Sequence, residues 1–159
     1  MSILETRLMA WPDEAACAAT AADLAAHPAL ADAFIELHGP LGAGKTTFAR
    51  HLLHALGVTG AIKSPTYALV EQYVAGSAVG GFAIGHFDFY RFDDPNEWED
   101  AGFREVFADP GLKLVEWPEK AAGLLPPCDL RLWITPHDRS DVRDARFEAM
   151  SVRGLELLP

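Results

Sequence analysis

A glycine-rich loop between a strand-like run and a helix-like run constrains the fold of this chain more than any other feature. Residues 39–46, GPLGAGKT, match the pattern GxxxxGK followed by Ser or Thr at every fixed position. The apolar run 33–38 precedes the loop, and the helix-like run 45–56 follows it and stops at Gly57. This order predicts a strand, a tight turn and a helix, as in layered α/β folds.

The same loop predicts phosphate binding. Glycines let backbone N–H groups converge on phosphate oxygens, and the helix that follows presents its positive end to them. Lys45 would reach the β- and γ-phosphates, and the hydroxyl of Thr46 would ligate Mg²⁺. The chain lacks the NKxD tetrapeptide that reads guanine and the LSGGQ-like segment of ABC-type ATPases. ATP is therefore the expected nucleotide.

Two acidic residues end apolar runs and are candidates for binding the metal ion or the attacking water. Asp88 follows the run 82–87, and Glu116 follows the run 112–115. Ligands of α/β sheets gather at the carboxyl ends of the strands, so we expect both carboxylates to lie opposite the loop. Either acid alone would be as consistent with a solvated strand end.

The rest of the pattern predicts a single domain, residues 1–159, with an α/β, P-loop NTPase-like layered fold and a mixed parallel and antiparallel sheet. A short helix is predicted to open at Pro118. Two hairpins are expected, 66–74 with 82–90 and 130–135 with 146–152, and further helices at 15–26 and 93–109.

Composition excludes several classes of protein. The chain has 13 basic and 23 acidic residues, a formal charge of −10, which disfavours binding to nucleic acid by itself. No run approaches the roughly 20 apolar residues of a membrane span, and the first residues lack the order of a signal peptide, so a cytoplasmic protein without a membrane partner is expected. Cys17 and Cys128 stand outside any CxxC pair, which argues against a disulfide framework or a zinc site.

Four segments in series resemble the TsaE (YjeE) family in order and approximate spacing: 39–47, then KSPTY at 63–67, HFDFYR at 86–91 and VEWP at 115–118. The resemblance covers roughly residues 10 to 150. Pro40 and Phe89 stand where family members often have Asp and Leu. TsaE proteins are small bacterial P-loop ATPases. They support the TsaD–TsaB enzyme, which places threonylcarbamoyl on the adenosine next to the anticodon of certain tRNAs.

The resemblance implies a role for individual residues. Thr46 and Glu116 would hold Mg²⁺. Thr66 resembles a switch threonine, and Asp88 matches an acid implicated in metal binding or water activation. The expected catalytic residues are Lys45, Thr66 and Asp88. The residues expected to bind ATP or ADP are Leu41, Gly42, Ala43, Gly44, Lys45 and Thr46, with Glu14 and either Arg143 or Arg146 approaching the nucleotide. The implied partners are TsaD and TsaB, with tRNA contacted only indirectly through the complex, and the chain alone is expected to be a monomer.

Two other functions remain open from the residues. A small-molecule P-loop kinase would need an acceptor pocket and an arginine-bearing lid. A non-catalytic scaffold would use bound ATP only to order residues 64–66. The sequence places no arginine where it could obviously act as an arginine finger. We therefore expect the chain alone to hydrolyse ATP weakly and a partner to stimulate it. The acidic segment 93–109, with seven acids and one base, is either a solvated helix face or a docking surface.

Overall fold

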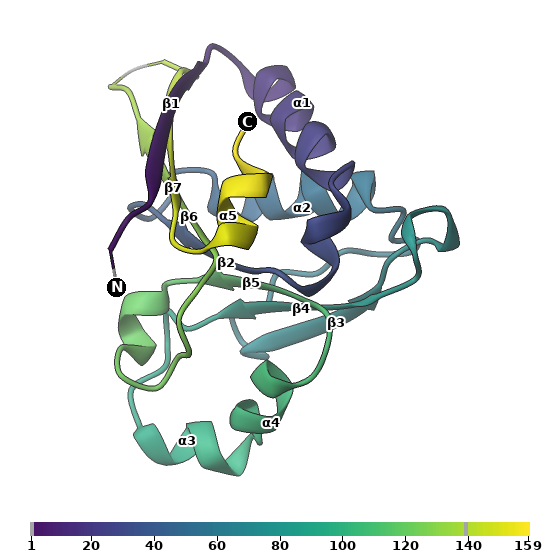
Figure 1. The fold of residues 1–159 in the computed structure, drawn as a ribbon. Helices are drawn as coiled ribbons and strands as arrows, with labels where there is room; N and C mark the ends of the chain where they lie inside the picture. The colour runs from purple at the N-terminus through teal and green to yellow at the C-terminus, as the bar shows by residue number, and fades with distance from the viewer. Residues whose placement is uncertain (1, 139) are drawn as a thin grey trace.

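A computed structural model describes residues 2–138 and 140–159, and the strands of this part form one seven-stranded mixed sheet (Figure 1). Strands β2, β4, β5 and β6 pair in parallel, whereas β1–β7, β6–β7 and β3–β4 are antiparallel, so the predicted mixed sheet is confirmed. In spatial order the strands are β1 (Glu5–Trp11), β7 (Arg143–Ala149), β6 (Leu130–Pro136), β2 (Phe34–His38), β5 (Leu112–Glu116), β4 (Ala83–Asp88) and β3 (Val70–Val74).

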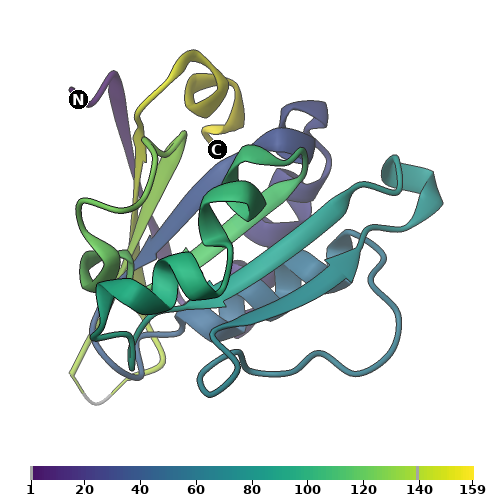
Figure 2. The ribbon, with the colours of Figure 1, turned by 90° about the horizontal axis from the view of Figure 1, so that it is seen from below.

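Helices cover the two faces of this sheet. On one face α1 (Glu14–Ala25) and α2 (Lys45–Ala55) pack against each other, and α5 (Val152–Leu157) packs on β7 (Figure 1). Figure 2, from below, shows α3 (Pro95–Asp100) and α4 (Phe103–Ala108) in front of the sheet. Three short 3₁₀ helices are η1 (Pro28–Asp32), η2 (Ser77–Val79) and η3 (Pro118–Ala121). No helix within the described residues is both long and apolar enough to span a membrane.

Buried side chains of the core, among them Trp11, Leu24 and Phe48, fix α1 and α2 beside the end of β1. The Asp13 side chain caps α1 by accepting a hydrogen bond from the Ala16 N–H at 2.9 Å. The Trp11 ring stacks on Phe48 of α2 with centroids 5.8 Å apart, and its Nε1 donates to Thr20 Oγ1 of α1 at 3.0 Å. These contacts place the start of α2, where the phosphate is expected, on a rigid support.

The alternation of side chains along β4 and β5 directs polar groups toward α2. In β4 Phe87 packs into the aromatic cluster beneath the sheet, so its neighbours on either side point to the opposite face. In β5 Val115 plays the same part. Asp88 and Glu116 therefore lie on the face that carries α2, at neighbouring register positions.

Several predicted boundaries were wrong. The chain forms β1, which the sequence analysis missed, because this edge strand is largely exposed and shows no clear alternation. The predicted helix 93–109 is broken into α3 and α4 at Gly102, which has a φ of 69°. The last strand begins at Arg143 instead of residue 146, and Val152, predicted to end it, begins α5. The hairpin 66–74 with 82–90 is confirmed, although β3 begins only at Val70.

Candidate phosphate site

The predicted phosphate loop connects β2 to α2. Gly39 follows β2 with a φ of 145°, and a Cβ there would clash with the carbonyl oxygen of Ile134 in β6. Gly44 precedes α2 with a φ of 111° and faces open space. The loop closes on itself through a hydrogen bond from the Ala43 N–H to the Pro40 carbonyl at 3.1 Å. The free N–H groups at the start of an 11-residue helix therefore face a hollow, which suits an anion.

Lys45 is buried at the first position of α2, with 5% of its surface exposed. Its ammonium donates to the Gly39 carbonyl and lies 3.4 Å from the centroid of the Trp117 ring. Burial lowers the pKa of Lys45, and the nearby carboxylates of Glu116, Glu119 and Asp88 oppose that shift. Within the part of the chain that the structure describes, this buried cation forms no ion pair with a carboxylate.

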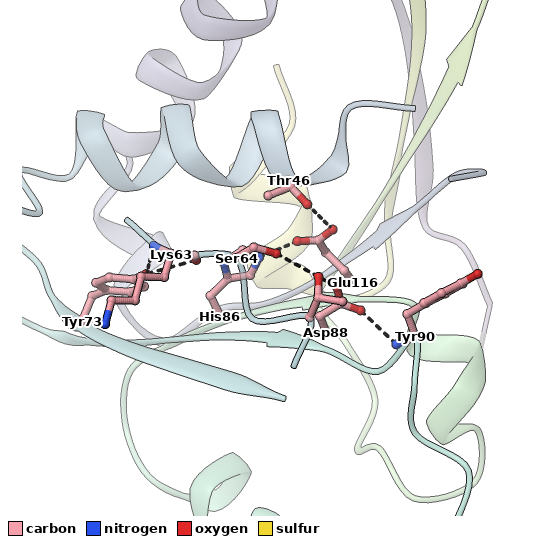
Figure 3. A network of polar contacts seen from close by, with 9 residues as sticks. Thr46, Lys63, Ser64, Tyr73, His86, Asp88, Tyr90 and Glu116 are labelled. Atoms are coloured by element: carbon pink, nitrogen blue, oxygen red, sulfur yellow. Dashed lines mark hydrogen bonds and ion pairs between the residues drawn. The ribbon is translucent and has the colours of Figure 1, made fainter. Parts of the chain in front are cut away.

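Glu116 joins α2 to the sheet. Its Oε1 accepts a hydrogen bond from Thr46 Oγ1 at 2.8 Å, and its Oε2 lies 2.6 Å from Nε2 of His86 (Figure 3). Both Glu116 and His86 are almost fully buried. Among the described residues, Nδ1 of His86 has no hydrogen-bond partner. The two oxygens of Glu116 are thus oriented by one contact each.

Asp88 lies beside Glu116 and is held by a different pair of contacts. Its Oδ2 accepts a hydrogen bond from Thr66 Oγ1 at 3.1 Å. Its Oδ1 accepts one from the Tyr90 N–H at 2.9 Å (Figure 3). Burial raises the pKa of Asp88, and the charge of Glu116 adds to the shift, whereas the contacts with Tyr90 and Thr66 oppose it. Thr66 also lies 2.8 Å from Ser64 Oγ, which ties the segment 64–66 to the strand end.

The structure brings most of the predicted site residues into one cavity of about 430 Å³. It also places Thr47, Tyr90, Arg91 and Trp117 there, which were not predicted from the sequence as site residues. The cavity is lined by Leu41, Gly42, Ala43, Gly44, Lys45, Thr46, Thr47, Thr66, Asp88, Tyr90, Arg91, Glu116 and Trp117.

Glu14 and Arg143 lie on the other side of the loop. Both border a second hollow of about 250 Å³ beside Trp11 and Cys17. Nε of Arg143 donates to the Ala43 carbonyl at 3.0 Å, which attaches the final hairpin to the loop. The alternative candidate, Arg146, is not brought to the loop. Its guanidinium lies 5.0 Å from the Trp133 ring centroid and its Nε 3.3 Å from Glu148, because consecutive residues of β7 point to opposite faces of the sheet.

The sequence contains a positional signal for His86 and Arg91. His86 is two residues before Asp88 in the same strand, so both side chains lie on one face of the sheet. Arg91 ends the turn that follows Asp88. The position of Trp117 follows from its left-handed φ of 55°, which the sequence does not reveal.

The oxygen donors of the cavity fit Mg²⁺. A hydroxyl from Thr46 and carboxylates from Glu116 and Asp88 are hard ligands, and Mg²⁺ in nucleotide sites uses one or two carboxylates together with water and phosphate oxygens. Within residues 2–138 and 140–159 no three His, Cys, Asp or Glu side chains gather as a metal-binding group. One hydroxyl and two carboxylates match an ion that shares its coordination with a nucleotide.

A β-strand, a glycine loop and a helix beginning with Lys and Thr, with carboxylates at the ends of neighbouring parallel strands, define a protein with the P-loop fold. The model of the family described as "Threonylcarbamoyl adenosine biosynthesis protein TsaE" matches residues 11–145. The chain therefore belongs to the TsaE family.

Individual relatives agree with this family. A Haemophilus influenzae protein named tRNA threonylcarbamoyladenosine biosynthesis protein TsaE is 41% identical over 124 residues, 78% of this chain and 75% of that protein. Its Bacillus subtilis namesake is 35% identical over 119 residues, 75% of this chain and 71% of that one. The crystal structure of Bacillus subtilis YdiB matches with a TM-score of 0.77 and 26% identity, covering 99% of this chain and 94% of that chain.

Proposed function

We propose that this chain binds Mg–ATP and hydrolyses it in support of the TsaD–TsaB enzyme, which places threonylcarbamoyl on tRNA. The observation that carries the proposal is one cavity that holds the phosphate loop, Lys45, Thr46 and the two strand-end carboxylates Asp88 and Glu116. The family of the chain supplies the biosynthetic context.

Each residue of the cavity would have its own role in binding and hydrolysing ATP. The N–H groups of the loop would bind the phosphates, and Lys45 would exchange its contact with the Gly39 carbonyl for phosphate oxygens. Thr46 and Glu116 would hold Mg²⁺, which when bound neutralises charge that develops on the phosphates. Asp88 Oδ2, with its raised pKa, would orient the attacking water and accept its proton.

The second hollow is the proposed place of the nucleoside. It begins at Ala43 and Gly44, so a nucleotide whose phosphates lie in the loop can extend into it. The Trp11 and Cys17 side chains supply apolar surface there, and Glu14, whose Oε1 lies 2.9 Å from Nε2 of His51, also lines this hollow. Arg143 would act on the nucleotide through the Ala43 backbone that it fixes.

Hydrolysis by purified chain with Mg²⁺, alone and then with TsaD, TsaB and tRNA, tests the proposal. Stimulation by the complex is expected. Lys45→Ala should raise the barrier by about 3 kcal/mol, as with other preorganised donors, and Glu116→Ala should also abolish stimulation. Arg50→Ala, on the exposed side of the same helix, is the matched control and should hydrolyse normally. An unchanged rate in Lys45→Ala would refute the catalytic role.

The same assay separates the alternatives. If the partners neither bind nor change the rate, the link to TsaD–TsaB fails and only the nucleotide site survives. Labelled phosphate recovered on a metabolite instead of in solution would indicate a kinase. Normal, ATP-dependent binding of the partners by Glu116→Ala, with no requirement for hydrolysis in the modification of tRNA, would indicate a scaffold.

A further inference from the structure

Arg91 stands in the wall of the cavity that contains Lys45 and Thr46. Its backbone is fixed because the residues around it are anchored. Phe89 is fully buried and its N–H donates to the Glu116 carbonyl at 3.1 Å, and the N–H of the buried Phe92 donates to the Phe89 carbonyl at 2.9 Å. The side chain of Arg91 itself is exposed. A long cationic side chain is therefore mounted on a rigid turn at the mouth of the cavity.

The present contacts of Arg91 are weak. Its guanidinium carbon lies 4.6 Å from the centroid of the Tyr67 ring, and Nη2 lies 3.5 Å from Tyr67 Oη, at the limit of a hydrogen bond. Tyr67 is 83% exposed, so water competes for this contact. Within residues 2–138 and 140–159 Arg91 forms no ion pair, although acidic residues outnumber basic ones by 23 to 13.

The charge of the cavity makes this arginine significant. Two carboxylates, Asp88 and Glu116, face a single buried cation, Lys45. A triphosphate remains anionic with its metal ion bound, so a second cation at the wall would offset part of its charge. Arg143 is engaged with the Ala43 carbonyl on the other side of the loop. Among the arginines only Arg91 lines this cavity within the described residues.

We propose that Arg91 is a phosphate-contacting residue that turns from the Tyr67 ring to the terminal phosphate of bound ATP. The proposal rests on the proposed function, since it assumes a nucleotide in this cavity. A guanidinium offers paired donors that match two phosphate oxygens. Because the contact is with the terminal phosphate, Arg91 distinguishes ATP from ADP.

The exchange also affects the segment that carries Tyr67. Thr66 is bonded to Asp88 and Tyr67 touches Arg91, so the segment 64–67 is joined to the turn 88–91 at two points. When Arg91 leaves Tyr67, only the contact between Thr66 and Asp88 remains. Binding of the terminal phosphate would thereby release the exposed Tyr67 side chain from Arg91.

Binding of Mg–ADP and of a non-hydrolysable Mg–ATP analogue, measured by calorimetry, tests the proposal. Arg91→Gln should weaken binding of the analogue by about tenfold or more, as for a lost charge-assisted hydrogen bond, and change ADP affinity by less than about twofold. Arg91→Lys, which keeps the charge without the fork, should fall between wild type and Arg91→Gln. The matched control is Arg104→Gln, an exposed arginine of α4 outside the cavity, and should bind both nucleotides normally.

Tyr67→Ala tests the resting contact. Removing the ring that competes for Arg91 should raise affinity for the analogue by about two- to fivefold, the range of an exposed cation–π contact, and leave ADP affinity unchanged. A loss as large as that of Arg91→Gln would show that the pair is a fixed wall of the site and overturn the exchange.

The outcomes separate this inference from the function on which it rests. If wild type binds both nucleotides and Arg91→Gln does so equally well, or loses both to the same extent, Arg91 has no contact with the terminal phosphate and the inference is wrong. If wild type binds neither nucleotide, the proposed function itself fails. Retained ADP binding shows that each variant is folded. If Arg91→Gln does not fold, the ratio of the affinities of Arg91→Lys for the ATP analogue and for ADP decides instead.

Discussion

His86 is predicted to orient Glu116, and His86→Leu is the sharpest test of how this proposed metal ligand is held. The Nε2 of His86 lies 2.6 Å from Glu116 Oε2, and the two side chains are 1% and 2% exposed. Leucine fills a similar volume but offers no donor. The substitution would therefore leave one carboxylate oxygen buried without a partner.

The size of the effect follows from that loss. A hydrogen bond to a charged group contributes about 1.5–3 kcal/mol, so we take about 2 kcal/mol as the expected loss in the free energy of unfolding. For a chain of this length this corresponds to a melting temperature about 4–8 °C lower. His86→Gln, which keeps an N–H donor, should lose less than half as much. In both variants the Mg²⁺ concentration for half-maximal hydrolysis should rise, because lost support of a metal ligand typically weakens metal binding about 10- to 100-fold.

Chemical denaturation of a double-mutant cycle is the assay. In the Glu116→Gln background the carboxylate is absent, so His86→Leu should cost about 1 kcal/mol less than it does in wild type. Additive costs would mean that His86 acts only by filling space. An unchanged Mg²⁺ requirement in His86→Leu would likewise refute its role in positioning Glu116, whatever the loss of stability.

Three further predictions concern other parts of the structure. Because burial raises the pKa of Asp88, the folded chain binds a proton at this carboxyl more tightly than the unfolded chain, and the ionised carboxylate destabilises the fold above its ordinary pKa. Asp88→Asn should therefore have a higher melting temperature than wild type at pH 7, and the difference should vanish below about pH 4. A lower melting temperature of the variant at pH 7 would contradict this reasoning. Burial raises the pKa of Cys17 to about 11 and that of Cys128 to about 12, so iodoacetamide at pH 8 should alkylate neither thiol until the chain is unfolded. Mass spectrometry measures the labelling, and rapid labelling of the folded chain would disprove this prediction. Arg143→Ala removes the donor to Ala43 and should weaken ATP and ADP binding alike, by about three- to tenfold in calorimetry, whereas a loss confined to ATP would mean that Arg143 contacts the terminal phosphate.

The sequence was sufficient for the parts of the site that depend on local pattern. The glycine loop predicts β2 and α2, because its spacing demands a strand before it and a helix after it. The positions of Asp88 and Glu116 follow from the rule that the ends of parallel strands meet at one edge, and the two are indeed register partners. The roles of these residues in binding and catalysis, and the limits of the single domain, stay predictions.

The features that the sequence did not reveal depend on contacts between residues far apart in the chain. β1 is recognisable only through its pairing with β7, since its exposed residues carry no alternation. The hollow on the α1 side of the loop needs Arg143 to reach Ala43 across 100 positions. Gly102 is an exception, because a glycine inside a helical pattern is a local signal that could have divided the predicted helix 93–109.

The residues of the candidate site differ in how firmly they are held, and this difference indicates where control can act. Lys45, Glu116 and His86 are buried and bonded to the loop or to the central strands, so the proposed phosphate and metal positions are set by the core. Tyr67 and Arg91 are exposed and touch through a contact that water weakens. The first group is covered by the fold, whereas a partner can touch the second group directly at the surface. We therefore expect stimulation by a partner to act through residues 64–67 and Arg91, where the arrangement is open to change.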